Sequence, residues 1–118
     1  MSPLTDDEVR KRRDAFLEVE SHNPMGIHWL SFCDPHKEPG GRFLGVVVVR
    51  ERGFTSALMF VHRLGLNPGG EVQGSEVPTE PVFEKVLEGH FNRLLSREEA
   101  VRLSEAVGAA WKEWERYE

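Results

Sequence analysis

The C-terminal part of the chain carries the pattern that most constrains its fold. Ser96 and Glu99 have the spacing of a capping box, in which each side chain bonds the backbone N–H of the other at a helix start. The apolar positions that follow recur every three or four residues: Ala100, Leu103, Val107, Ala110, Trp114 and Tyr117. A helix of about 22 residues, roughly 33 Å long, is therefore predicted. Because a small sheet needs less cover than this, part of the helix is expected to project or to meet a partner.

The segment 25–77 contains the predicted sheet. Alternating and β-branched runs predict strands at residues 25–33, 43–50 and 71–77, with a helix over residues 55–64 between the last two. The valine run from Val46 to Val49 makes the second strand apolar on both faces, which favours the central position for it. The first strand is expected to pair antiparallel with the second. The second strand, the helix and the third strand are expected to form one crossover, right-handed if those two strands are parallel.

The fold class predicted from these elements is α+β, in a single domain of residues 1–118, since this length suits one domain. The expected core is a small mixed sheet of about three strands, in the order strand–strand–helix–strand. An N-terminal helix over residues 5–20 has a narrow apolar stripe, so we expect it to lie on the body. A short helix near residues 82–88 and the long final helix make up a C-terminal helical region from residue 80 onward.

The charge of the chain is unevenly distributed. The 15 basic and 20 acidic residues give a net charge of −5. Residues 1–70 are neutral, so the whole excess lies in residues 71–118. An acidic chain lacks the positive field that general affinity for nucleic acid or an anionic membrane requires, so neither partner is expected. We interpret the acidic region as a solvated helix face, with a surface for a basic partner as the alternative.

Cys33 is the single cysteine, so no internal disulfide is expected, and the sequence favours a cytoplasmic location. No signal peptide or membrane-spanning run is found. Cys33 and His36 have the spacing of half a metal site, but the second ligand pair of a structural zinc site is missing, so no metal is expected. A nucleophilic Cys33 with His36 as its base is the enzymatic hypothesis. No cofactor is implied.

Two helices carry candidate partner-binding residues. Met59 and Phe60 fall outside the sheet-covering face of the 55–64 helix. They are expected to lie under the C-terminal helix or, if exposed, to form a dimer surface with the open edge of the sheet. On the C-terminal helix, Trp114 lies in the main seam and Trp111 lies beside it. A second strip, expected to dock a partner or the N-terminal helix, consists of Val101, Ser104, Gly108 and Trp111.

Three segments carry a resemblance to known proteins: Phe43–Val49, Leu64–Val72 and Asn92–Glu99. They look like a group of small uncharacterised bacterial and phage-associated proteins, in which a strand–helix–strand unit ends in a similar Leu-Gly-x-Asn-Pro-Gly-Gly-Glu segment. The resemblance covers residues 26–99 and brings no known activity or catalytic residues. It implies that Asn67, Gly69, Gly70 and Glu71 matter beyond the turn that they form.

These observations favour a non-enzymatic protein–protein interaction module, an accessory or inhibitory protein that acts as a homodimer or other homo-oligomer. The first alternative is a small-ligand or anion-binding domain. It would use the 34–42 loop with Arg42 and the turn from Asn67 to Glu71, where glycine pairs leave backbone amides open to an anion. An enzyme with a Cys33/His36 site is the least favoured of the three.

Overall fold

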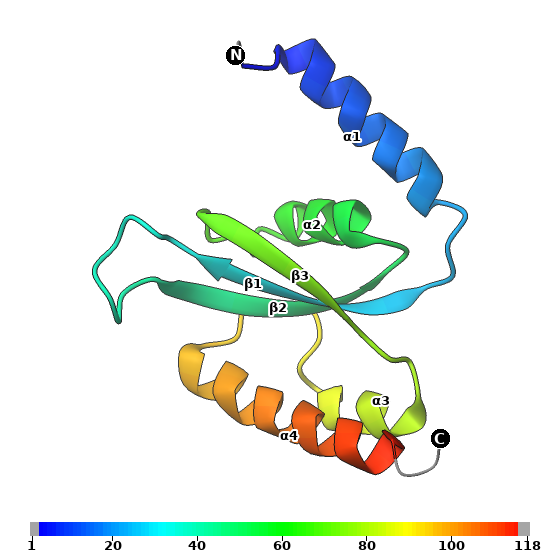
Figure 1. The fold of residues 1–118 in the computed structure, drawn as a ribbon, viewed down its shortest axis with the longest axis vertical. Coiled ribbons are helices and arrows are strands. Elements are labelled where there is room, and N and C mark those ends of the chain that lie inside the picture. The colour runs from blue at the N-terminus through cyan, green and yellow to red at the C-terminus, as the bar shows by residue number, and fades with distance from the viewer. Residues whose placement is uncertain (1–2, 116–118) are drawn as a thin grey trace.

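The computed structural model describes residues 3–115 of the 118-residue chain. Its helices and strands, in chain order, are α1 (Asp6–Glu20), β1 (Gly26–Cys33), β2 (Phe43–Glu51), α2 (Phe54–Arg63), β3 (Glu71–Val77), α3 (Pro81–Leu87) and α4 (Arg97–Glu115). Each predicted element is present, and the α+β class is confirmed. Figure 1 shows the sheet between α2 on one side and α3 with α4 on the other, with α1 beyond α2.

The sheet is antiparallel throughout, in the order β2–β1–β3. The central strand is therefore β1, so the prediction of a central β2 is wrong, and the strands pair only antiparallel within residues 3–115, not as the mixed sheet that was expected. The strands β2 and β3 still run in the same direction, because each is antiparallel to β1, and α2 links them across it. At one end of the sheet Cys33 pairs with both Phe43 and Glu71.

The outer edge of β2 is covered by the segment 91–95. The Leu95 N–H donates to the Val46 carbonyl at 2.7 Å, and the Asn92 N–H donates to the Val48 carbonyl at 2.9 Å. Helices lie over both faces of β2, so its valines from Val46 to Val49 are all buried. The valine run therefore reflects cover by two helical layers and a loop, which is why it falsely indicated a central strand.

The helix α2 closes one face of the sheet. The buried cluster beneath it consists of Leu30, Phe32, Val47, Val49, Ala57 and Val61. These residues alternate along the strands and lie four apart on the helix, as one-sided burial requires. The cover extends to β3, where the Phe54 ring occupies the space that a side chain on Gly74 would need.

The helices α3 and α4 cover the opposite face. The predicted capping box of α4 is confirmed, since Glu99 N–H donates to Ser96 Oγ at 3.2 Å and Ser96 N–H donates to Glu99 Oε1 at 3.3 Å. Along the predicted seam, Ala100, Leu103 and Ala110 are buried, Val107 and Trp114 are half-buried, and Tyr117 lies outside the described residues.

The C-terminal half of α4 packs on α3. The buried Phe83 ring lies 5.3 Å from the Trp111 ring and 5.8 Å from the Trp114 ring, both in edge-to-face geometry. The sheet and α3 together therefore account for the length of α4 over the described residues, and the expectation of a projecting segment is wrong there.

The helix α1 extends away from the body (Figure 1). Its predicted cap is confirmed, because Glu8 N–H donates to Thr5 Oγ1 at 3.2 Å. None of its side chains is buried, and Phe16 is 61% exposed. The expectation that its apolar stripe lies on the body is therefore wrong.

The C-terminal end of α1 is attached to α2 through Glu20. The N-cap of α2 is Gly53, which has no side chain, and the Glu20 carboxylate takes over by accepting the N–H groups of Thr55 at 3.1 Å and Ser56 at 2.9 Å. Partial burial raises the pKa of Glu20, but the hydrogen bonds from Ser56 and Thr55 outweigh it and hold the pKa below its ordinary value.

Candidate functional site

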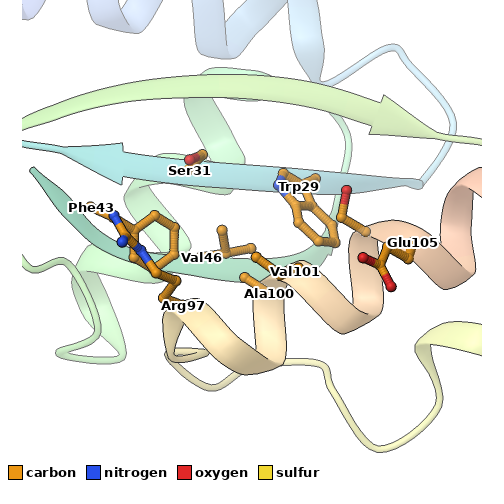
Figure 2. A pocket seen from close by; sticks show the side chains of 9 residues that line it. Trp29, Ser31, Phe43, Val46, Arg97, Ala100, Val101 and Glu105 are labelled. Atoms are coloured by element: carbon orange, nitrogen blue, oxygen red, sulfur yellow. The ribbon is translucent and has the colours of Figure 1, made fainter. Parts of the chain in front are cut away.

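A groove lies on the α4 face of the sheet, between the strands and the N-terminal half of α4. Its volume is about 520 Å³, and it is lined by Trp29, Ser31, Phe43, Val46, Arg97, Ala100, Val101, Ser104 and Glu105. Figure 2 shows Trp29 pointing from β1 toward α4, with Phe43 and Arg97 beside each other at the opposite end. This cavity is called the groove from here on.

A smaller hollow of about 190 Å³ continues from the groove toward β3. It shares Trp29 and Ser104 with the groove and adds Ser75, Glu76, Val77, Val107 and Trp111. The Trp111 ring, which is 36% exposed, therefore lines this arm while its other side packs on Phe83.

The groove is open because α4 lies over β2 and leaves β1 and β3 partly uncovered. The segment 91–95, which leads into α4, is hydrogen-bonded to the β2 edge and fixes where the helix starts. Small side chains then surround Trp29: Ser75 is its partner on β3, Ser31 follows on the same face, and Ser104 faces it from α4. These small side chains leave the space beside Trp29 open.

The rim of the groove carries charges of both signs. Arg97 lies at the Phe43 end, with its guanidinium 5.8 Å from the ring centroid. Glu105 lies near Trp29 (Figure 2), and Glu71 and Glu76 are exposed on β3. Both charged residues of β3 are therefore acidic, and their side chains point to opposite faces of the sheet.

The outer edge of β3 is open. Within residues 3–115, β3 pairs only with β1, and the isolated bridges involve β2 alone. The backbone N–H and C=O groups on this edge face solvent, directly beside the small arm of the groove.

The predicted partner-binding residues lie on two different faces. The second strip of α4 faces the groove through Val101, Ser104 and Trp111, not the N-terminal helix. Trp114 is half-buried against Phe83.

Met59 and Phe60 are half-buried on α2, on the far side of the sheet from α4. The expectation that they lie under the C-terminal helix is wrong, because the two helices cover opposite faces. The structure therefore does not bring these two residues together with Trp111.

The predicted ligand residues lie at one end of the sheet, where Cys33 pairs with both neighbours. Their polar atoms are engaged locally: Arg42 Nε–H donates to the Lys37 carbonyl at 2.9 Å, and Asn67 Oδ1 accepts the Gly69 N–H at 2.8 Å. Gly70 packs against the Cys33 carbonyl with no room for a side chain, and Glu71 begins β3. These contacts account for the two turns, and a ligand-binding role of these residues stays a prediction.

The Cys33 thiol is half-buried at the end of β1. The His36 N–H donates to Asp34 Oδ1 at 3.0 Å, as in a local turn, and no hydrogen bond of the described residues joins the thiol to a histidine. Residues 3–115 contain no group of three or more potential metal ligands. A nucleophilic Cys33 with His36 as its base stays a prediction.

The sequence pattern did not indicate Trp29, Ser31, Phe43 or Glu105 as candidate site residues. A signal was present in β1, where Ile27, Trp29 and Ser31 share one face. That face becomes polar after two residues, as expected for a strand whose face is only partly covered. The sequence alone does not reveal which helix would leave it uncovered.

Comparisons with protein-family models, with curated proteins and with solved structures find no match to this chain. No helix of residues 3–115 combines the length and the apolar character needed to cross a membrane.

Proposed function

We propose that this protein is a non-enzymatic protein-interaction module that binds an extended segment of another protein as a fourth strand on β3. The observation that supports this is the open β3 edge lying directly beside an apolar groove. Strand addition of this kind takes its affinity from main-chain hydrogen bonds and its specificity from pockets for alternate side chains.

The backbone of β3 is suited to this role. Proteins usually protect a free sheet edge by covering it, and the β2 edge is covered by the segment 91–95. The β3 edge, over the seven residues from Glu71 to Val77, is left open. A partner strand of similar length would pair its backbone with these groups.

The groove would receive side chains from the added strand. Every second residue of a strand points to the same face, so alternate side chains of the partner would point toward the α4 side. There they would meet Trp29 and Trp111 in the small arm of the groove. Apolar residues at these alternate positions would bury the two aromatic surfaces.

The charge of this edge favours a basic partner. Glu71 and Glu76 are the charged residues of β3, and Glu105 lies on the facing side of the groove. Pairing two copies of the chain through β3 would gather four carboxylates from the two strands without a basic residue from either. A segment carrying Lys or Arg beside its apolar residues complements the edge instead. The homodimer expected from the sequence stays a prediction, as do the accessory or inhibitory role and the cytoplasmic location.

Selection of random extended peptides on the purified full chain tests the proposal. The enriched peptides should alternate apolar and basic residues, and their binding should perturb the backbone amide NMR signals of β3. Failure to enrich any such pattern would contradict it.

Two matched variants locate the binding. Val101 in the groove and Val9 on α1 are each 51% exposed on helices, so Val101→Arg and Val9→Arg make equivalent changes at the two sites. For a selected peptide, Val101→Arg should weaken binding about tenfold or more, and Val9→Arg should leave it unchanged. Equal effects of the two variants would overturn the proposed site. A dimer in light scattering that Val101→Arg dissociates would show that a second copy occupies the groove instead.

A further inference from the structure

A second cavity, distinct from the groove, lies at the N-terminal end of β1. It has a volume of about 430 Å³ and forms where the α1–β1 connection meets the start of the β3–α3 connection. Its polar wall is made by Asn23, His28, Arg52, Glu76 and Thr79. Glu76 lies at the boundary with the small arm of the groove. None of these residues is used in the proposed strand pairing except Glu76.

The His28 ring is the buried polar group of this wall, with 3% of the residue exposed. Its Nε2 lies 3.1 Å from the Glu51 carbonyl oxygen. Because a carbonyl only accepts, Nε2 carries the proton, and in the neutral ring Nδ1 is then an acceptor. No buried side-chain nitrogen or oxygen among residues 3–115 lacks a partner, so Nδ1, which has no hydrogen bond within these residues, keeps some exposed surface, and His28 lines the cavity.

Arg52 supplies a positive charge at a fixed position. Its NH1 donates to the Asn23 carbonyl at 2.7 Å, while Asn23 Nδ2 donates to the Arg52 carbonyl at 3.0 Å. These two hydrogen bonds join the α1–β1 connection to the end of β2, and they engage one of the guanidinium nitrogens of Arg52. The remaining N–H groups of Arg52 are left for a ligand.

Glu76 supplies the negative charge. It is the β3 partner of His28, so the two side chains lie on the same face of the sheet. Neither Glu76 nor Arg52 has an ion pair within 4.0 Å among the described residues. The cavity therefore holds a cation and an anion that do not neutralise each other.

We propose that this cavity binds a small zwitterion of the amino-acid type. The ligand carboxylate would accept hydrogen bonds from Arg52, and its ammonium group would donate to Glu76 and to His28 Nδ1. A volume of about 430 Å³ lies in the range of small-molecule sites. A ligand with one charge would pair with only one of Arg52 and Glu76, so a zwitterion should bind more tightly than either single-charge analogue.

Calorimetry and thermal unfolding with defined probes test this site. L-leucine carries both charges, while 3-methylbutylamine and 4-methylpentanoate each keep its side chain and lack one of them. L-leucine should bind the full chain and raise its melting temperature, and each single-charge analogue should bind about tenfold or more weakly. Glycylglycine has a larger separation between its ammonium and carboxylate groups, so it tests whether the distance between Arg52 and Glu76 suits a free amino acid or a short peptide. Binding of either L-leucine or glycylglycine supports the proposal.

Variants then separate this site from others. Arg52→Gln and Glu76→Gln should each weaken binding of the better zwitterion about tenfold or more, whereas Arg42→Gln and Glu71→Gln, at the opposite end of the sheet, should not. Binding should also change the ring nitrogen chemical shifts of His28. Val101 lines the groove and does not line this cavity, so Val101→Arg should leave zwitterion binding intact. Absence of binding by both zwitterions at millimolar concentration, or binding that survives Arg52→Gln and Glu76→Gln, would overturn the proposal.

Discussion

The two faces of the sheet differ in how completely helices cover them. The burial of alternate side chains along β1 shows this difference. Leu30 and Phe32 point to the α2 face and are buried, whereas Trp29 and Ser31 point to the α4 face and are half-buried. A single strand thus alternates between a closed and an open environment with a period of two residues.

The difference follows from how each helix is anchored. The helix α2 leaves β2 after a short connection and leads to β3, so it crosses the sheet and covers all three strands. The segment 91–95 that leads into α4 is hydrogen-bonded to the outer edge of β2, and α4 stays over that strand. A face stays open when its helix is attached at one edge, and in this chain the opening lies beside the free β3 edge.

The largest expected effect contrasts the two faces directly. Phe32→Ala removes a fully buried ring from the closed face and should lower the free energy of unfolding by about 3–5 kcal/mol. Trp29→Ala removes a larger ring that already faces the groove, so the loss should be smaller by about 2 kcal/mol. Urea denaturation of both variants measures this. Equal losses would mean that the α4 face is as closed as the α2 face.

The elements of both faces were predictable because their signals are local. The capping box of Ser96 and Glu99 and the strand from Glu71 to Val77 depend on neighbouring residues only. The order of the strands was not predictable in this way, because the burial of β2 comes partly from residues 91–95, far along the chain. The same holds for Trp29, whose exposure depends on where α4 is attached.

Gly74 tests how tightly the closed face is packed at β3. A methyl group there would collide with the Phe54 ring and lie 3.3 Å from Leu30 Cδ2. Since Phe54 is 41% exposed, its ring can move outward, and Gly74→Ala should cost about 1–2 kcal/mol of unfolding free energy. In a Phe54→Ala background the same change should cost nothing measurable or stabilise slightly. A cost that persists in that background would show that Phe54 is not the obstacle.

Glu20 tests whether α2 depends on α1 for its cap. Glu20→Gln should lower the free energy of unfolding by about 1 kcal/mol near neutral pH, because it removes the charge at the α2 N-terminus. Glu18→Gln, on the exposed side of the same helix, serves as the control and should stay within about 0.5 kcal/mol.

The pH dependence of this difference has a definite sign. The folded-state pKa of Glu20 lies below its ordinary value of 4.5, so the carboxylate stabilises the fold above that pH and its contribution is lost as the pH falls through the folded pKa. The gap between wild type and Glu20→Gln should therefore be full near neutral pH and shrink in acid. A gap that grows on acidification would contradict the capping role.

The smallest expected change in stability comes from substituting Gly108, which lies on the helix that covers the open face. It lies in the interior of α4 on the strip that includes Val101 and Ser104, and a methyl group there would meet no atom within 4 Å outside its own helix. Gly108→Ala should therefore stabilise the protein by about 0.5–1 kcal/mol, because alanine loses less backbone entropy than glycine in a helix. Thermal unfolding measures the gain, and binding of the selected peptide should be unaffected. Destabilisation would mean that α4 in solution moves against the sheet and closes the groove, which would remove the difference between the two faces.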